Sequence, residues 1–470
     1  MMRRNVPKVW RRWKKKLLLV ALAVGLAASL FALTPQFKVH FLPFDEVRDL
    51  IRAMVDAGAP DLPPSEINNA ASWDGWIRSR DHEIRGRIDR GIEDSISNLI
   101  LFGTSYTQLP PIPSSDEGAD ASGQLTIASR DRIHALGQAL LKPGENERIR
   151  FASDFLARHS VAPSVVNSYL TANLQRMILE ERTYEFKQQE ARKTGDPDAL
   201  LMTRATIYKE RGLSFDTSLE PDYALDTMLR QLAGKGLTPR GGIRRIAVMG
   251  PGLDFADKRI GLDFYPIQTI QPFAIMESVL RLKLGSPETV RVVAFDLNPA
   301  VLAHIERLAA RGRAGSPYVV QLPNDSRNGW PPELISYWQH FGDVLGTPTR
   351  PFGPPGFFKG VNVRAVAIRP QLAVHVSGQD LNMVAQQLEV APGGGFDLVI
   401  ATNIFVYYNF FEQALAMQNI SHMLNPGGIF LVNQILSNQH PDSLKLIDQC
   451  NVSFNSEGLF GDDVVAYQQQ

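Results

Sequence analysis

The chain has 470 residues, of which 49 are basic and 49 acidic, so its formal net charge is zero. That balance argues against a nucleic-acid-binding protein that works through bulk positive charge. The single cysteine, Cys450, excludes an internal disulfide and a cysteine-based zinc site. The hydrophobic fraction of 44% is ordinary for a globular protein, and the length suffices for two or three domains.

The first 35 residues form a segment of their own. Residues 1–16 carry eight Lys or Arg and no acid, and residues 17–33 are wholly apolar or small. This pattern predicts an uncleaved signal anchor, a single membrane helix with its basic flank in the cytoplasm. A cleaved signal peptide and a peripheral segment remain the alternatives. A spanning anchor places the rest of the chain outside the cytoplasm.

Residues 36–238 are predicted to form a mainly α-helical domain. Apolar residues recur there at helical spacing, most clearly over 163–193 and over 221–236. Residues 108–123 are rich in Pro, Ser, Gly and Asp, which predicts an exposed loop or linker. No motif in this half indicates a chemistry.

The sequence pattern changes over residues 239–470, where short runs rich in Val and Ile alternate with helical stretches. The predicted strands lie within 246–250, 290–296, 372–378, 396–403 and 428–434. The predicted helices lie within 270–284, 298–312, 380–390 and 410–424. This alternation predicts an α/β domain with a doubly wound, mostly parallel sheet, and ligands of such sheets bind beyond the carboxyl ends of the strands.

Four of the predicted strands end in distinctive residues. The first runs into Gly250, Pro251 and Gly252, where glycine lets a ligand approach the backbone closely. The second ends in Asp296, whose carboxylate has two oxygens and can accept both hydroxyls of a ribose. The third ends in Asp380, and the fourth runs into Asn403.

In this order the strand ends resemble those of class I S-adenosylmethionine-dependent methyltransferases. The "LNPGGIFLV" turn at 424–432 is the most recognisable element, and "FDLVIATNIFVYYNFFEQ" at 396–413 is similar to the fourth-strand block of chemotaxis-receptor glutamate methyltransferases. The resemblance covers roughly residues 240–440. It implies a Rossmann-like fold and S-adenosyl-L-methionine as the cofactor.

The resemblance also implies roles for particular residues. Gly250 and Gly252, with Asp254 beyond them, would face the methionine part of the cofactor, and Asp296 with Leu297 would bind the ribose. Asp380 and Leu381 would lie near the adenine amine. Asn403 would line the mouth near the sulfonium, where it and Tyr407 are the candidate catalytic residues. The set is Gly250, Gly252, Asp254, Asp296, Leu297, Asp380, Leu381, Asn403 and Tyr407.

Each of these residues also has a plainer interpretation. The glycines can form only a tight turn, and Asp296 can cap the helix that begins at Pro299, although Asn298 serves as well. Asp380 can cap the next predicted helix, and Tyr407 can be a packing residue. The chain also departs from the family, because Val248 stands where an acid is usual and Asp254 where a third glycine is usual.

Two insertions lengthen the predicted domain. The first, at about residues 253–268, is either a lid or substrate wall or an elaboration of the packing. The second, at 313–370, is rich in aromatic residues. Its members Trp330, Tyr337, Trp338 and Phe341 form either an apolar acceptor pocket or a small satellite core.

The sequence therefore favours a membrane-anchored, methyltransferase-like enzyme whose methyl acceptor is unknown. An alternative is a catalytically inactive interaction or scaffold protein at the membrane that keeps the fold. A nicotinamide-dependent oxidoreductase is a third hypothesis. Phe255 argues against it, because it occupies the position of the third glycine in a dinucleotide-binding fingerprint. Neither a nucleic-acid partner nor a metal site is expected, and the oligomeric state is left open.

Overall fold

The computed structural model describes residues 37–470 except 60, 240–241, 257–261, 357, 435, 437–440 and 459. Within these, Val39–Gln470 form one compact unit. The predicted basic and apolar segments at 1–16 and 17–33 lie outside the described residues. Across the part that is described, no helix is long and apolar enough to cross a membrane.

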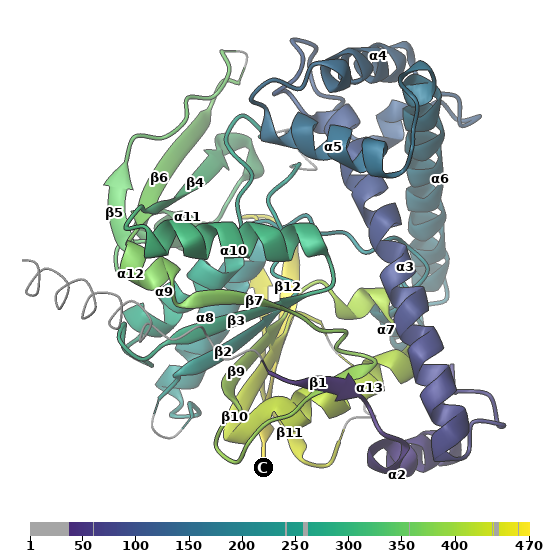
Figure 1. Cartoon of the computed structure of the whole chain (residues 1–470), viewed down its shortest axis with the longest axis vertical. Coiled ribbons are helices and arrows are strands. Elements are labelled where there is room, and N and C mark those ends of the chain that lie inside the picture. The colour runs from purple at the N-terminus through teal and green to yellow at the C-terminus, as the bar shows by residue number, and fades with distance from the viewer. Residues whose placement is uncertain are drawn as a thin grey trace, which may run out of the picture. The chain divides into compact units, whose positions relative to one another are not determined.

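The first half of this unit is mainly α-helical (Figure 1). Its helices are α2 (Phe44–Asp56), α3 (Ala70–Phe102), α4 (Ile127–Leu141), α5 (Glu147–Arg158), α6 (Val166–Lys193), α7 (Pro197–Ala205) and α8 (Glu220–Gly234). Asn69 begins α3, because its side chain accepts hydrogen bonds from the backbone N–H groups of Ala71 and Ser72. The long helices α3 and α6 pack against each other.

The second half contains a seven-stranded mixed sheet whose strand order is β11-β12-β10-β9-β2-β3-β7. The five strands from β10 to β7 are parallel, and β12 and β11 continue the sheet in antiparallel fashion. The strands are β2 (Arg245–Met249), β3 (Arg291–Asp296), β7 (Val376–Asp380), β9 (Phe396–Ala401), β10 (Leu424–Val432), β11 (Leu444–Ser453) and β12 (Gly461–Gln469). The predicted doubly wound, mostly parallel sheet is thus confirmed.

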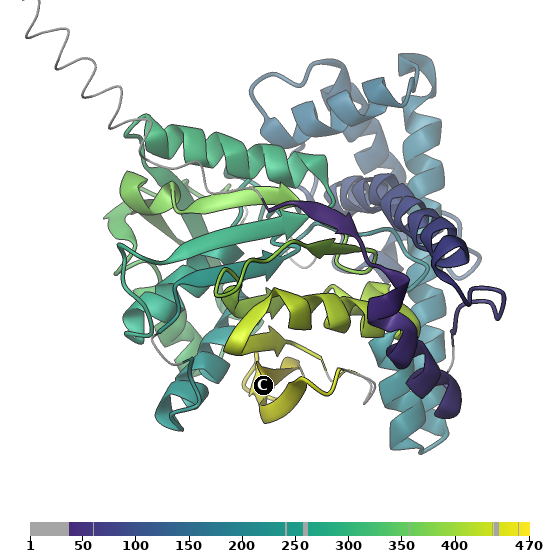
Figure 2. The same ribbon diagram turned by 60° about the horizontal axis from the view of Figure 1, so that its bottom comes forward.

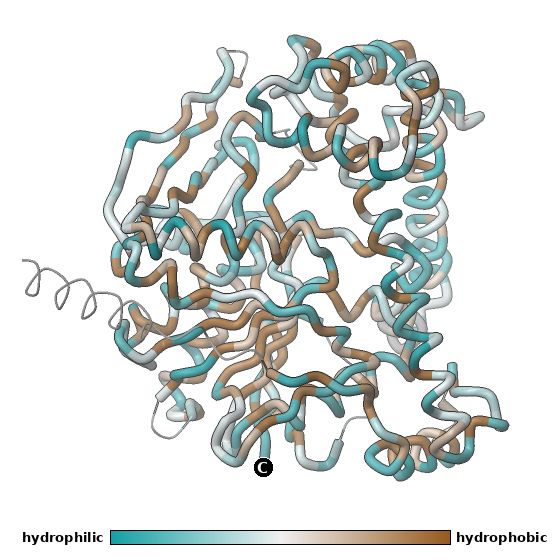
Figure 3. The backbone as a smooth tube through the Cα atoms, viewed as in Figure 1, coloured by the Kyte–Doolittle hydropathy of each residue, from teal (hydrophilic) through white to brown (hydrophobic). Residues whose placement is uncertain are grey.

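The sheet is buried between helices on both faces. Figure 2 shows α10 (Pro299–Arg313) and α13 (Phe410–Met423) on opposite sides of the strands, and α9 (Gln271–Arg281) packs against β3 and α8. The strands are mostly apolar (Figure 3). Ile246, Val248 and Ile400 are fully buried, and each such side chain contributes about 1.5–3 kcal/mol to stability.

A smaller three-stranded antiparallel sheet, in the order β4-β6-β5, fills the predicted insertion at 313–370. Its elements are β4 (Tyr318–Asp325), α11 (Pro332–His340), β5 (Gly346–Thr349) and β6 (Val361–Ile368). The sequence did not indicate these strands, nor β11 and β12 at the carboxyl end. Tyr337, Trp338 and Phe341 are buried around α11 and belong to the main hydrophobic core, not to a separate satellite core.

The predicted helix at 380–390 is wrong. The chain there turns and then forms the short strand β8 (Gln386–Leu388). The side chain of Asn382 accepts a hydrogen bond from the backbone N–H of Val384, which favours a turn. Strand β8 then pairs with β1 (Val39–Phe41), so tertiary pairing overrides the local helical pattern. The predicted strand at 372–378 begins only at Val376, because the one-turn helix α12 (Pro370–Ala373) precedes it.

Contacts between the two halves are extensive within this unit. Besides the β1–β8 pairing, the guanidinium group of Arg87 on α3 donates to the backbone carbonyl of Tyr407 at 2.9 Å. Helix α8 packs on β11 and β12. The domain boundary that the sequence suggests at residues 238 and 239 stays a prediction.

Candidate functional site

A cavity of about 490 Å³ opens at the carboxyl ends of the parallel strands. It lies where the chain order reverses, between β2, which leads on to β3 and β7, and β9, which leads on to β10. Such switch points are where doubly wound sheets bind ligands. The strand ends supply the residues Met249, Gly250, Gly252, Phe295, Asp296, Leu297, Leu381, Met383, Thr402 and Asn403.

The glycine turn is shaped by the chain's own backbone. Gly250 and Gly252 have φ values of +63° and +64°, in the left-handed region that favours glycine. A Cβ on Gly252 would lie 2.5 Å from the carbonyl oxygen of Phe215. The next residue, Leu253, donates its N–H to that same oxygen at 2.6 Å. Gly252 is therefore required because residues 213–219 lie directly against the turn.

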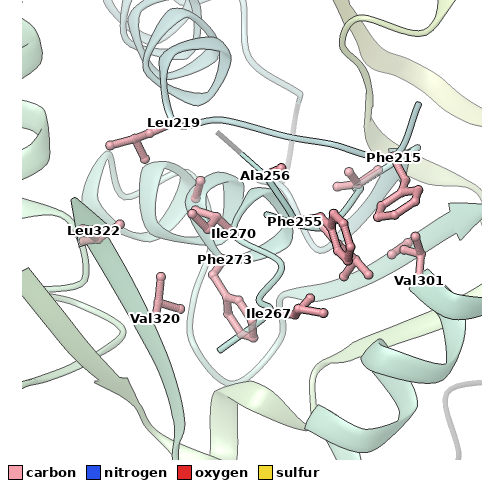
Figure 4. Close-up of a cluster of buried hydrophobic side chains, with 14 of the residues drawn as sticks. Phe215, Leu219, Phe255, Ala256, Ile267, Ile270, Phe273, Val301, Val320 and Leu322 are labelled. Carbon is pink, nitrogen blue, oxygen red and sulfur yellow. The ribbon is translucent and has the colours of Figure 1, made fainter. Parts of the chain in front are cut away.

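Apolar side chains pack between the segment of residues 213–219 and the glycine turn (Figure 4). The rings of Phe215 and Phe255 meet at 5.6 Å between centroids, and Phe151 from α5 contacts both rings. Phe255 is fully buried. Phe255, at the position of the third glycine in a dinucleotide-binding fingerprint, is therefore part of the hydrophobic core.

Asp296 lies partly buried in the cavity at the end of β3. Its Oδ1 accepts the backbone N–H of Asn298 at 2.7 Å. Burial raises the pKa of Asp296 to about 7, and the N–H groups of Asn298 and Gly252 oppose that rise. Asn298, not Asp296, caps helix α10, because its side chain accepts the N–H of Ala300. The capping interpretation of Asp296 is therefore wrong, and its carboxylate faces the cavity.

Asp254 also lines the cavity, on the side of the insertions. Its carboxylate accepts the hydroxyl of Tyr265 at 2.8 Å and the side-chain amide of Gln268 at 2.9 Å. The amide of Gln268 also donates to the carbonyl of Gln321 on β4. Asp254, Ala256, Leu262 and Tyr265 all line the cavity, so the described part of the first insertion forms a wall. Within that loop, residues 257–261 lie outside the described residues.

A buried arginine of the helical half fixes the same wall. The guanidinium group of Arg148 on α5 donates to the backbone carbonyls of Asp254, Phe255 and Tyr265. Asp263 in turn accepts the backbone N–H groups of Thr104 and Ser105, which follow α3. The wall is thus held rigidly by residues far away in sequence.

Asn403 and Tyr407 lie at the end of β9, as expected from the sequence. Asn403 is exposed at the cavity and has a φ of +57°. Its side chain and backbone both bond to Asn433 on the neighbouring chain segment, at 2.7 and 2.8 Å. The ring of Tyr407 packs 5.9 Å from that of Tyr208, and its backbone carbonyl accepts Arg87 from α3.

Asp380 is the one predicted site residue that the structure places outside the cavity lining. Its carboxylate is about half exposed and receives two N–H groups of Arg85 on α3, at 2.7 and 2.8 Å. The Asp380 carboxylate thus has its hydrogen-bonding partner, the Arg85 guanidinium, outside the cavity. Leu381 and Met383, which follow β7, line the cavity instead.

The sequence missed the part of the lining that comes from other elements. Residues 214–221 cover the glycine turn, Ile88 comes from α3, Tyr208 follows α7, and Leu322, Pro323 and Trp330 come from the second insertion. Trp330 had been a candidate for an acceptor pocket, and it alone of the four aromatic residues named there lines the cavity. No local motif marks the segment 214–221.

The described lining is strongly acidic. It includes four carboxylates and no Lys, Arg or His among the residues that the structure describes; the acids are Asp216, Glu220, Asp254 and Asp296. A dinucleotide brings two negatively charged phosphates, which such a lining repels. The lining instead suits a ligand with positive charge.

Comparisons with protein-family models and with curated proteins found no match. Among solved structures, the chain is similar to the N-methyltransferase NodS from Bradyrhizobium japonicum WM9 at 12% identity, over 53% of this chain and 97% of that one, with a TM-score of 0.27. TrmN from Thermus thermophilus is 15% identical over 53% and 52% of the two chains, with a TM-score of 0.26. Magnesium protoporphyrin IX methyltransferase from Synechocystis PCC 6803 is 8% identical over 60% and 97%, with a TM-score of 0.25. At these scores the fold assignment rests on the strand order alone.

Proposed function

We propose that this chain is an S-adenosyl-L-methionine-dependent methyltransferase that acts on an acceptor yet to be identified. One observation carries the proposal. The glycine turn, Asp296, Leu381 and Asn403 follow four parallel strands and surround a single cavity at the switch point of the sheet. The glycine turn, Asp296 and Asn403 are also residues on which the sequence resemblance rests, whereas Leu381 lies in the cavity in place of its neighbour Asp380.

The residues present fit this cofactor. The Asp296 carboxylate can accept both ribose hydroxyls, while the apolar side chains of Leu381 and Met383 suit the adenine ring. Gly250 and Gly252 line the cavity where the methionine part would lie, and the acidic lining suits a cationic ligand. When bound, S-adenosyl-L-methionine supplies a methyl group on a positively charged sulfur. The protein's contribution is to hold an acceptor in line with that methyl group and to exclude water.

A second candidate is a protein that keeps the fold without catalysis. Two observations favour it: Val248 is fully buried where an acid is usual, and the Asp254 carboxylate is engaged by Tyr265 and Gln268. Neither feature closes the cavity. The two candidates therefore differ in whether the cavity binds the cofactor.

Isothermal titration calorimetry of the full chain with S-adenosyl-L-methionine and with S-adenosylhomocysteine tests the proposal. We expect binding of both ligands and no binding of a nicotinamide dinucleotide. The absence of heat at millimolar S-adenosylhomocysteine would refute the enzyme and favour the second candidate. Binding of the dinucleotide would restore the oxidoreductase hypothesis.

Cofactor affinity is expected to rise with pH. Because the pKa of Asp296 is about 7 in the free protein, its carboxylate is mostly protonated at pH 6 and mostly ionised at pH 8. The ionised form is the two-oxygen acceptor, so we expect S-adenosylhomocysteine to bind about tenfold more tightly at pH 8 than at pH 6. Titrations in two buffers of different ionisation enthalpy should show proton release near pH 6. An affinity independent of pH contradicts the assigned role.

We also propose that residues 17–33 hold the chain at a membrane, a proposal supported by the run of basic residues followed by apolar ones. Liposome flotation of the full chain tests it, compared with a variant carrying Leu22→Arg and Leu26→Arg. Equal flotation of the two chains would contradict it.

A further inference from the structure

Strand β2 brings no charge of its own to the cavity. Val248 pairs with Ala294 on β3 and Ile400 on β9, and its side chain is fully buried in the hydrophobic core. The nearest acid after the turn, Asp254, is turned toward Tyr265 and Gln268 on the insertion side. Neither Val248 nor Asp254 therefore places a carboxylate on the other side of the turn.

The segment Leu213–Leu219 supplies one. Its backbone forms a parallel bridge with the turn, in which Leu253 donates to Phe215 at 2.6 Å and Thr217 donates to Leu253 at 3.2 Å. The residue between these two bonds is Asp216, which lines the cavity. Asp216 is therefore placed beside the glycine turn by backbone hydrogen bonds on both sides.

Two buried residues of α3 fix the side chain of Asp216. The hydroxyl of Ser95 donates to its Oδ2 at 3.0 Å, and the amide of Asn98 lies 3.5 Å from the same oxygen. The hydroxyl of Ser214 also lies 3.5 Å from this oxygen, so hydroxyl and amide donors orient the carboxylate. Asp216 is also near Tyr407: burial chiefly raises the pKa of that phenol, and the Asp216 charge adds to the rise against the opposing Arg211.

Asp216 thus lies between the end of β2 and the residues that follow β9. Asp216 lines the same cavity as Asp296 and Asn403. We propose that Asp216, contributed by the helical half of the chain, binds the α-ammonium group of the cofactor's amino-acid tail. This inference rests on the proposed function and assigns to the segment Leu213–Leu219 the recognition of that tail.

Two ligands separate this role from a structural one. S-adenosylhomocysteine carries the ammonium group, and 5′-methylthioadenosine has the same nucleoside without the amino-acid tail. We expect Asp216→Asn in the full chain to weaken S-adenosylhomocysteine binding about tenfold to hundredfold, since a charge-assisted hydrogen bond is lost. Binding of 5′-methylthioadenosine should change less than twofold. Equal weakening of both ligands, or no weakening of either, overturns the inference.

Two further variants complete the test. Asp380→Asn changes a carboxylate that pairs with Arg85 outside the cavity lining, and it should leave the preference between the two ligands unchanged. Ser95→Ala removes the hydroxyl that orients Asp216 and should weaken S-adenosylhomocysteine alone, by a smaller factor than Asp216→Asn. Ser95→Ala also tests the role of Asp216 if the Asp216→Asn variant does not fold. A wild-type chain that binds neither ligand refutes the proposed function itself, whereas a wild-type chain that binds both equally refutes only the assignment of Asp216.

Discussion

Replacing Asp296 with Asn is expected to weaken S-adenosylhomocysteine binding by about a hundredfold while making the free protein more stable at pH 8. The loss of affinity follows because two hydroxyl groups lose a charged acceptor, and each such bond contributes about 1.5–3 kcal/mol. Calorimetric titration measures the affinity, and chemical denaturation measures the free energy of unfolding.

The gain in stability follows from the raised pKa of Asp296. Burial raises it to about 7 in the folded chain, against about 3.9 in the unfolded chain. A carboxyl group raised in this way contributes stability that is present below pH 4 and is lost as the pH rises toward 7. Asn does not ionise, so the advantage of the variant should grow by about 2 kcal/mol between pH 5 and pH 8.

The comparison across pH also removes a confounding effect. Asn gives up hydrogen bonds to backbone N–H groups, but that cost does not depend on pH, so the change between pH 5 and pH 8 isolates the carboxylate. Asp380→Asn on the adjacent strand is the matched control, because Asp380 pairs with Arg85 outside the cavity. It should leave the affinity within twofold of the wild type. A hundredfold loss in that variant would return Asp380 to the cofactor site.

The sequence predicts well those site residues that local pattern determines. Gly250, Asp296 and Asn403 each follow a short apolar run, and the carboxyl ends of parallel strands meet at one edge of a sheet. Recognising the strands therefore suffices to bring these residues together. The same reasoning succeeds for α10 and α13, whose first turns are capped by Asn298 and Asn409.

The positions of residues that depend on contacts distant in the chain could not be predicted from the sequence. Asp380 also follows a strand, yet it pairs with Arg85, which lies 295 positions away along the chain. The segment around Asp216 reaches the cavity through backbone hydrogen bonds, which leave no trace in side-chain pattern. Only Leu444 and Val452 of strand β11 are buried, so no apolar run in the sequence indicates this strand.

Gly252→Ala is expected to destabilise the chain by about 3 kcal/mol and to abolish measurable binding of S-adenosylhomocysteine. The positive φ alone costs a non-glycine residue about 1–2 kcal/mol, and the new Cβ would lie 2.5 Å from the Phe215 carbonyl oxygen. Relief of that clash moves the segment Leu213–Leu219 off the turn, which costs about 1–3 kcal/mol more. Asp216 and the other residues of this segment that line the cavity move with it.

Gly315→Ala separates the two contributions to that loss. Gly315, just beyond α10, has a φ of +76° and nothing within 4 Å of an added Cβ, so it reports the backbone cost without a clash. We expect it to lose about 1 kcal/mol and to bind normally. If Gly252→Ala behaves like Gly315→Ala in denaturation and calorimetry, the segment is not held by the turn. If Gly252→Ala is destabilised further and loses the ligand, Gly252 is required because the segment Leu213–Leu219 packs against the turn. The helical half of the chain is then a component of the binding site.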